Sequence, residues 1–88
     1  MVIKNVIYTE KFERNVKSIK DGTMKQRVKK TIEKIIENPG IGKPLRFDLK
    51  GERTVYIKPY RLIYAVENEN IIFLRFMHRD DVYSHAKK

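Results

Sequence analysis

The chain has 88 residues, with 20 Lys plus Arg against 11 Asp plus Glu, so its formal net charge is 20 − 11 = +9. This length suits one domain, and we expect residues 1–88 to form a single one. An apolar content of 41% is too high for a fully disordered chain. The charge predicts a polyanionic partner (RNA, DNA, an anionic membrane surface or an acidic protein), and the alternative is a surface tuned for solubility.

Composition also excludes several kinds of site. Cysteine is absent, so no disulfide or cysteine-based metal site can form. The two histidines are too few for a histidine metal site, and the four glycines are scattered instead of forming a phosphate-binding loop. We therefore expect no metal and no cofactor. No apolar run approaches the roughly 20 residues that span a bilayer, so we expect a cytoplasmic protein without a membrane segment.

The N-terminal third predicts a strand and a first helix. Residues Val2 to Tyr8 are rich in β-branched and apolar side chains, as is typical of a strand. Thr9 is a candidate cap for a following helix, which Asp21-Gly22 would end. The apolar residues of this helix, at helical spacing, are Phe12, Val16 and Ile19.

A second helix is the clearest amphipathic pattern in the chain. Thr23 and Gln26 match a capping box, and Asn38-Pro39-Gly40 would stop the helix. Its apolar face contains Met24, Val28, Ile32, Ile35 and Ile36. Its basic face contains Lys25, Arg27, Lys29, Lys30 and Lys34. The short turn between the helices predicts an antiparallel hairpin.

The second half of the chain predicts three consecutive strands. An irregular connection, residues 41–51, is partly extended where Leu45, Phe47 and Leu49 alternate with polar residues. The predicted strands are Arg53 to Lys58, Tyr60 to Glu67 and Ile71 to Met77. The order β-α-α-β-β-β predicts an α+β fold, with a helical hairpin packed on a mainly antiparallel sheet of about four strands. The first strand must join this sheet, because it has no partner elsewhere.

Basic and aromatic residues in this half could carry a metal-free chemistry. In RNA scission the 2′-hydroxyl attacks the adjacent phosphate, and the transition state gains negative charge that Arg and Lys stabilise. Arg serves only as a charge, whereas Lys, Tyr and His can transfer protons, and aromatic rings stack on bases. The residues of this kind are Lys58, Tyr60, Arg61, Tyr64, Arg75, His78, Arg79 and Tyr83.

Each of these residues also has a structural interpretation. Arg61 lies within an apolar strand, where an ion pair with Glu67 or Glu52 would satisfy it. Lys58 would be an exposed residue of a turn, and His78 would be a polar residue at a strand end whose hydrogen bonds are made within the fold. Tyr60, Tyr64 and Tyr83 would pack on the sheet. The basic helix face would be solvated.

Two segments resemble a known toxin family. The segment Pro59–Val66, Pro-Tyr-Arg-Leu-Ile-Tyr-Ala-Val, resembles the central strand Tyr-Arg-(Leu/Ile/Val)-(Val/Ile)-Tyr of the RelE/ParE toxin superfamily. His78–Tyr83, His-Arg-Asp-Asp-Val-Tyr, resembles the ending His-Arg-x-x-Val-Tyr of many RelE members. Gly42–Arg46 and Leu49–Gly51 resemble the connector of the same family. The order and spacing of these segments agree over almost the whole chain.

The resemblance implies an α+β toxin bound by a cognate antitoxin. RelE-like members cut messenger RNA in the ribosomal A site without a metal, whereas ParE-like members act on DNA gyrase. The catalytic residues that carry over are Arg61, Lys58 on the preceding strand, Arg79 and Tyr83. Two positions that are often basic in the nucleases hold Tyr56 and Met77 here.

We therefore predict a ribosome-dependent messenger RNA endonuclease, the toxin of a type II toxin–antitoxin system. The predicted partners are an antitoxin, the ribosome and messenger RNA, and the predicted state is a monomer or a hetero-oligomer formed with the antitoxin. The predicted catalytic residues are Lys58, Arg61, Arg79 and Tyr83, and the predicted substrate-binding residues are Arg46, Arg75 and His78. The alternatives are a ParE-like topoisomerase inhibitor and a non-catalytic RNA-binding domain.

Overall fold

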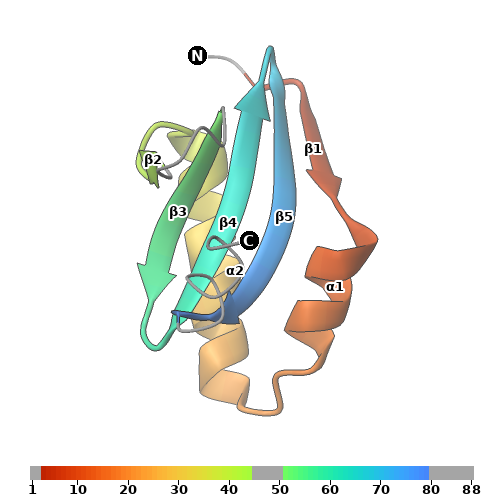
Figure 1. Ribbon diagram of the computed structural model, residues 1–88, viewed down its shortest axis with the longest axis vertical. Coiled ribbons are helices and arrows are strands. Elements are labelled where there is room, and N and C mark those ends of the chain that lie inside the picture. The colour runs from red at the N-terminus through yellow and green to blue at the C-terminus, as the bar shows by residue number, and fades with distance from the viewer. Residues whose placement is uncertain (1–2, 45–50, 80–88) are drawn as a thin grey trace, which may run out of the picture.

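The computed structural model describes residues 3–44 and 51–79, which form two helices and five strands. The sheet order is β1-β5-β4-β3-β2 (Figure 1). In chain order the elements are β1 (Asn5–Tyr8), α1 (Glu10–Lys17), α2 (Gly22–Glu37), β2 (Lys43–Pro44), β3 (Glu52–Ile57), β4 (Tyr60–Glu67) and β5 (Asn70–His78).

The sheet confirms the predicted α+β class and corrects the strand count. β1 joins the sheet by parallel pairing with β5, and the other neighbouring strands are antiparallel. The sheet has five strands where about four were predicted, because β2 adds one at the edge. A strand of two residues that ends in proline has no recognisable sequence pattern, and proline is tolerated there because β2 lies at the sheet edge.

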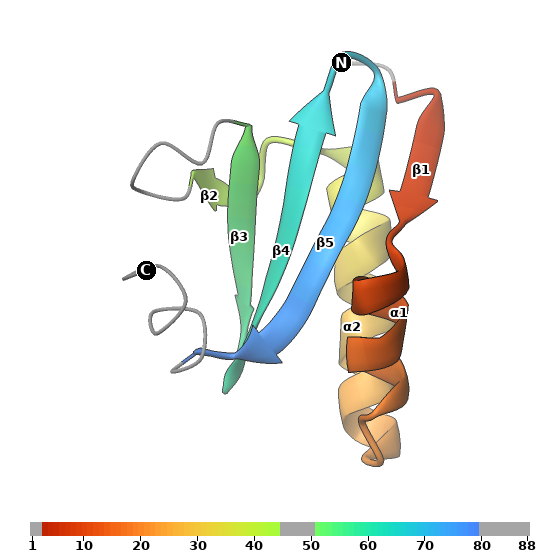
Figure 2. The same ribbon diagram turned by 45° about the vertical axis from the view of Figure 1, so that its right-hand side comes forward.

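Both helices lie on the same side of the sheet (Figure 2). Thr9 caps α1 as predicted, since its Oγ1 accepts a hydrogen bond from the Phe12 N–H at 3.1 Å. The predicted cap of α2 is wrong: Asp21, not Thr23, occupies that position, and its carboxylate accepts from the Thr23 N–H at 2.9 Å. Among the described residues, neither helix is long and apolar enough to cross a membrane.

The core fills the layer between α2, α1 and the covered face of the sheet. The predicted apolar face of α2 is confirmed, because Met24, Val28 and Ile35 are buried. Fully burying a side chain of this size contributes about 1.5–3 kcal/mol. The core residues from the sheet are Ile57, Leu62, Tyr64, Ile71, Phe73 and Phe76.

A β-bulge in β5 lets two phenylalanines face the same layer. Ile63 pairs with Arg75 but Tyr64 pairs with Phe73, so Leu74 is the extra residue. The extra residue shifts the alternation of side chains, and both Phe73 and Phe76 are buried in the core. Arg75 therefore lies on the opposite face of the sheet, away from the helices.

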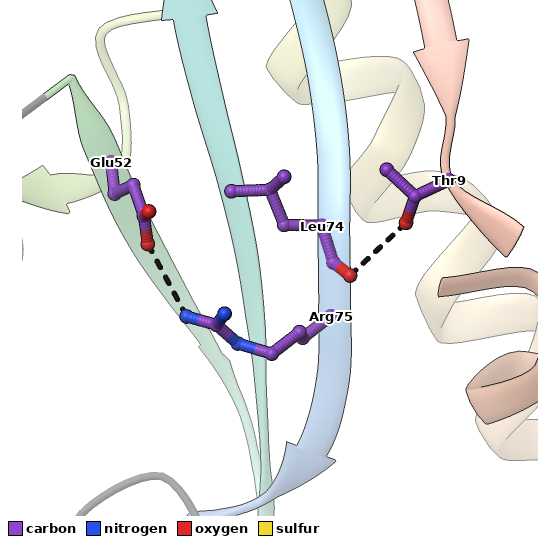
Figure 3. A network of polar contacts seen from close by, with 4 residues as sticks. All are labelled: Thr9, Glu52, Leu74 and Arg75. Carbon is purple, nitrogen blue, oxygen red and sulfur yellow. Dashed lines mark hydrogen bonds and ion pairs between the residues drawn. The ribbon is translucent and has the colours of Figure 1, made fainter. Parts of the chain in front are cut away.

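Helix α1 covers the edge of β5 beyond the end of β1. The Thr9 hydroxyl donates to the Leu74 carbonyl at 3.1 Å (Figure 3). Asn15 Oδ1 accepts from the Phe76 N–H at 3.1 Å. These bonds satisfy backbone groups that an open sheet edge would leave unpaired. They also fix the end of β5, which carries the predicted residue His78 and is followed by the predicted residue Arg79.

A buried tyrosine ties the connection after α2 to the sheet. Tyr64 donates its hydroxyl hydrogen to the Pro39 carbonyl at 2.7 Å and accepts from the Gly42 N–H at 3.0 Å. A Cβ on Gly42 would lie 2.7 Å from the Tyr64 hydroxyl, so only glycine fits there. Burial raises the pKa of Tyr64, although the Gly42 N–H and the nearby Arg53 lower it in part. Arg53 Nη1 also donates to the Gly42 carbonyl at 2.6 Å.

Candidate functional site

The face of the sheet away from the helices carries most of the predicted site residues. Side chains alternate along a strand, so in β4 Arg61 and Ile63 face away from the layer that Leu62 and Tyr64 help to form. The register places Tyr56, Arg61 and Met77 in one row across β3, β4 and β5. We call the face that contains this row the open face.

Arg61 lies over an aromatic ring. Its Cζ atom is 4.8 Å from the centroid of the Tyr56 ring, within the range of a cation–π interaction. The predicted alternative was an ion pair with Glu67 or Glu52. Glu67 is six residues along the same strand, roughly 20 Å away, and the Glu52 carboxylate binds Arg75 instead.

Lys58 and Arg79 lie at the same end of the sheet as Arg61. Lys58 and Pro59, joined by a cis peptide bond, form the turn between β3 and β4. Arg79 follows β5, and its N–H donates to the Pro59 carbonyl at 3.1 Å. The structure thus brings together three of the four predicted catalytic residues. We call Tyr56, Lys58, Arg61 and Arg79 the basic end of the sheet.

A residue of α2 also contacts this turn. Arg27 Nη1 donates to the Lys58 carbonyl at 3.3 Å. Both carbonyls of the turn therefore accept a hydrogen bond, one from α2 and one from Arg79. The contact links the basic face of the helix to the part of the sheet that carries Lys58.

Arg75 lies on the open face but its charge is partly compensated. Its Nη2 is 3.2 Å from Glu52 Oε1 (Figure 3), and the two side chains are 30% and 21% exposed. This pair occupies the middle of the face, further along the strands than the basic end. Its predicted part in substrate binding stays a prediction.

His78 lies on the other face of the sheet. It pairs with Tyr60 across β4 and β5, and the two rings meet edge to face with centroids 5.9 Å apart. Tyr60 in turn stacks on Phe76 at 4.8 Å. His78 is therefore near the basic end in the sheet but separated from Arg61 by the sheet itself.

Two of the predicted site residues lie outside the described ranges, and two residues at or near the basic end were not predicted to belong to it. Arg46 and Tyr83 lie outside the described residues. Tyr56 was predicted as a departure from a basic position, and the structure places its ring against Arg61. The two-residue turn between β3 and β4 could have predicted this contact from the sequence, because such a turn places Tyr56 opposite Arg61. Arg27 carried no such signal, since its contact depends on how α2 packs.

The basic end provides fixed positive charge beside an aromatic ring. A planar guanidinium on an aromatic face is suited to binding a phosphate through paired N–H donors. Within residues 3–44 and 51–79 no group of three His, Asp or Glu side chains gathers that could hold a metal ion. The chemistry that these side chains offer is anion binding and stabilisation of developing negative charge.

The family is established by comparison with known proteins. A family profile described as the ParE toxin of the type II toxin–antitoxin system parDE matches residues 6–83. The chain belongs to the RelE/ParE superfamily of toxins. The predicted family is therefore confirmed.

Individual relatives agree with this assignment. A stretch of 45 residues is 40% identical to toxin RelG of Mycobacterium tuberculosis, covering 49% of this chain and 52% of RelG, so the match spans about half of that relative. A chain of the RelBE2 toxin–antitoxin complex of M. tuberculosis is 26% identical, with a TM-score of 0.72 over 89% of this chain and 100% of that one. A chain of the DinJ–YafQ toxin–antitoxin complex of E. coli shares the fold, with a TM-score of 0.76 at 19% identity over 93% and 99% of the two chains.

Proposed function

We propose that this toxin is a ribosome-dependent messenger RNA endonuclease that needs no metal. The observation that carries the proposal is the guanidinium of Arg61, which lies over the Tyr56 ring at 4.8 Å at the end of the sheet that also holds Lys58 and Arg79. Positive charge on a surface of this kind matches a phosphate whose negative charge increases during scission. The motifs that resemble RelE favour the same activity.

The proposed roles follow from the chemistry of each group. Arg61 and Arg79 bind the oxygens of the scissile phosphate and stabilise the charge that develops on them. Lys58 stabilises this charge or transfers a proton. Tyr83 stacks on a base or transfers a proton. The Tyr56 ring orients Arg61, because a guanidinium prefers to lie flat on an aromatic face.

Replacing Arg61 tests the proposal directly. We expect Arg61→Ala to lower the rate of messenger RNA cleavage on programmed ribosomes by about 100-fold or more, as when one oxyanion donor is lost. Arg61→Lys should restore only part of the rate, because an ammonium cannot form two parallel bonds to a phosphate. The variant should remain folded, which its melting curve checks, because a residue that binds a phosphate is not required for the fold.

A variant that removes the same charge elsewhere provides the control. Lys25 is exposed on α2, and Lys25→Ala should leave the cleavage rate within about threefold of the wild-type value. A folded Arg61→Ala protein that cuts at the wild-type rate would remove Arg61 from the mechanism. A wild-type protein that cuts no messenger RNA on ribosomes would overturn the proposed activity as a whole.

The second candidate function is inhibition of DNA gyrase. It is favoured by the family profile, whose description names the ParE toxin, and by Tyr56 at a position that is often basic in the nucleases. A supercoiling assay with purified gyrase separates the two functions, because a nuclease should leave supercoiling unchanged. Inhibition of gyrase without cleavage of messenger RNA would establish the second candidate.

We also propose that a cognate antitoxin binds this chain. A described complex of M. tuberculosis, RelBE2, contains a toxin and its antitoxin, and the charge of +9 suits an acidic partner segment. Co-purification with the product of the adjacent reading frame tests this. Full toxin activity in the presence of that product, with no complex formed, would contradict the proposal.

A further inference from the structure

A cavity lies on the helix side of the sheet, at the same end as the catalytic candidates. Its volume is about 310 Å³, at the lower end of the range typical of small-molecule sites. The end of α1 forms one side, and the ends of β4 and β5 form the other. Its lining includes Asn15, Ser18, Ile19, Tyr60, Phe76 and His78.

The cavity and the basic end share neighbouring residues. Tyr60, which lines the cavity, directly precedes Arg61 in β4, and His78 directly precedes Arg79. Adjacent side chains of a strand point to opposite faces, so the two sites occupy opposite sides of one sheet end. A strand of RNA held by Arg61 can therefore place a flanking nucleotide at the cavity by passing around this end.

The hydrogen bonds around the cavity determine which of its polar groups can donate and which can accept. Asn15 Oδ1 accepts a hydrogen bond from the Phe76 N–H at 3.1 Å, which fixes the orientation of the side-chain amide. The Nδ2 group therefore remains as the donor of this side chain. Within the described part of the chain Nδ2 makes no hydrogen bond. Ser18 donates to the Asn15 carbonyl at 2.7 Å and keeps its lone pairs as acceptors. Asn15 and Ser18 thus offer the cavity a donor and an acceptor beside aromatic rings.

We propose that this cavity binds a nucleobase of the RNA, next to the nucleotide whose phosphate the basic end binds. This inference rests on the proposed function and adds a site for base selection. A base carries both acceptors and donors on its edge, which match Asn15 and Ser18, and it has a flat face for contact with the ring of Tyr60. The donor at Asn15 favours bases that present an acceptor.

Titration of the whole toxin with small probes tests the site without ribosomes. The probes are the four nucleoside 3′-monophosphates, with ribose 5-phosphate as a control that has a phosphate but no base. We expect at least one nucleotide to shift the NMR signals of the Asn15 side-chain amide and of Ser18. Ribose 5-phosphate should leave these signals unchanged.

A pair of substitutions sharpens the test. Asn15→Asp keeps the oxygen that accepts from Phe76 and removes the Nδ2 donor, so it should weaken nucleotide binding by about 10-fold or more. Asn38→Asp is the matched control, because Asn38 Oδ1 accepts from the Gly40 N–H at 3.3 Å at the far end of α2. It adds the same charge and should change binding by less than about threefold.

Each outcome decides between the explanations. Equal effects of Asn15→Asp and Asn38→Asp, or equal shifts with ribose 5-phosphate, would overturn the base site. Shifts with an antitoxin peptide but with no nucleotide would also overturn it, in favour of a protein-binding site. Cleavage of messenger RNA by a toxin whose cavity binds no nucleotide would leave the proposed function standing. Base binding by a toxin that cuts nothing would retain the site and reject the function.

Discussion

The two faces of this sheet differ in how far their polar side chains are buried and in what those side chains contact. On the face covered by the helices, Tyr64 is fully buried and its hydroxyl makes two hydrogen bonds to the backbone. On the open face, Arg61 and Arg75 are only partly buried. Arg61 lies over the Tyr56 ring, and Arg75 forms an ion pair with the Glu52 carboxylate. β4 supplies both faces through simple alternation. Changes to the buried side chains of the covered face should therefore cost stability, and changes to Arg61 and Arg75 on the open face should mainly cost activity.

The largest effect on stability is expected at Phe73. Its ring is fully buried and lies 5.3 Å from both Tyr8 and Phe12, so Phe73→Ala would leave a cavity in the core. We expect the free energy of unfolding to fall by about 3–5 kcal/mol. Ile7→Ala is the control, because this side chain is 45% exposed, and it should cost about 1 kcal/mol or less. Equal losses in denaturant titrations would contradict the difference between buried and exposed positions.

A smaller loss is expected when only the hydroxyl of Tyr64 is removed. Tyr64→Phe leaves the Gly42 N–H and the Pro39 carbonyl without their described partner, and both residues are buried. We expect a loss of about 1–3 kcal/mol, the cost of unsatisfied buried groups. Tyr8→Phe removes a hydroxyl from a side chain that is 45% exposed and should change stability by less than about 0.5 kcal/mol.

The same hydroxyl predicts a dependence of stability on pH. Burial raises the pKa of Tyr64 above its ordinary value of 10.0, so the unfolded chain releases this proton first as the pH rises. The contribution of Tyr64 is fully present below pH 10 and is lost as the pH rises through the folded pKa. The difference in stability between wild type and Tyr64→Phe should be constant up to about pH 9 and shrink above pH 10. A difference that grows above pH 10 would contradict this.

The covered face could be predicted from the sequence much better than the contacts between elements. The apolar spacing of α2 and the nearly continuous apolar run of β4 gave both elements, because burial acts directly on these patterns. β2 was missed because a strand of two residues is too short to show a periodic pattern of apolar side chains. The bulge at Leu74 was missed because the alternation around it breaks only once the pairing with β4 is known.

The sequence indicated candidate residues for the site, but not how they are arranged. The motif that contains Arg61 indicated it as a candidate, and the register of the turn would have placed Tyr56 opposite it. The ion pair between Arg75 and Glu52 joins residues that lie 23 positions apart, so no local pattern identifies it. The contact of Arg27 with the Lys58 carbonyl likewise depends on packing of α2.

The smallest expected effect concerns the ion pair on the open face. A double-mutant cycle on Glu52 and Arg75 should give a coupling of about 1 kcal/mol or less, because both side chains retain some exposure to solvent. The pair of Lys4 and Glu69, 66% and 53% exposed at 3.6 Å, should give a value near zero.

Removing the Glu52 carboxylate from its ion pair with Arg75 also tests whether Arg75 binds substrate. In Glu52→Gln the Arg75 charge loses its counterion, so RNA affinity at low salt should increase by a factor of about two to five. Glu69→Gln removes the same charge from an exposed pair near the opposite end of the sheet, and it should increase affinity less. If the two substitutions raise affinity equally, the net charge alone is responsible and Arg75 does not bind the RNA. A larger increase for Glu52→Gln that disappears in the Arg75→Ala background would assign the effect to Arg75 and extend the RNA-binding surface from the basic end to the middle of the open face.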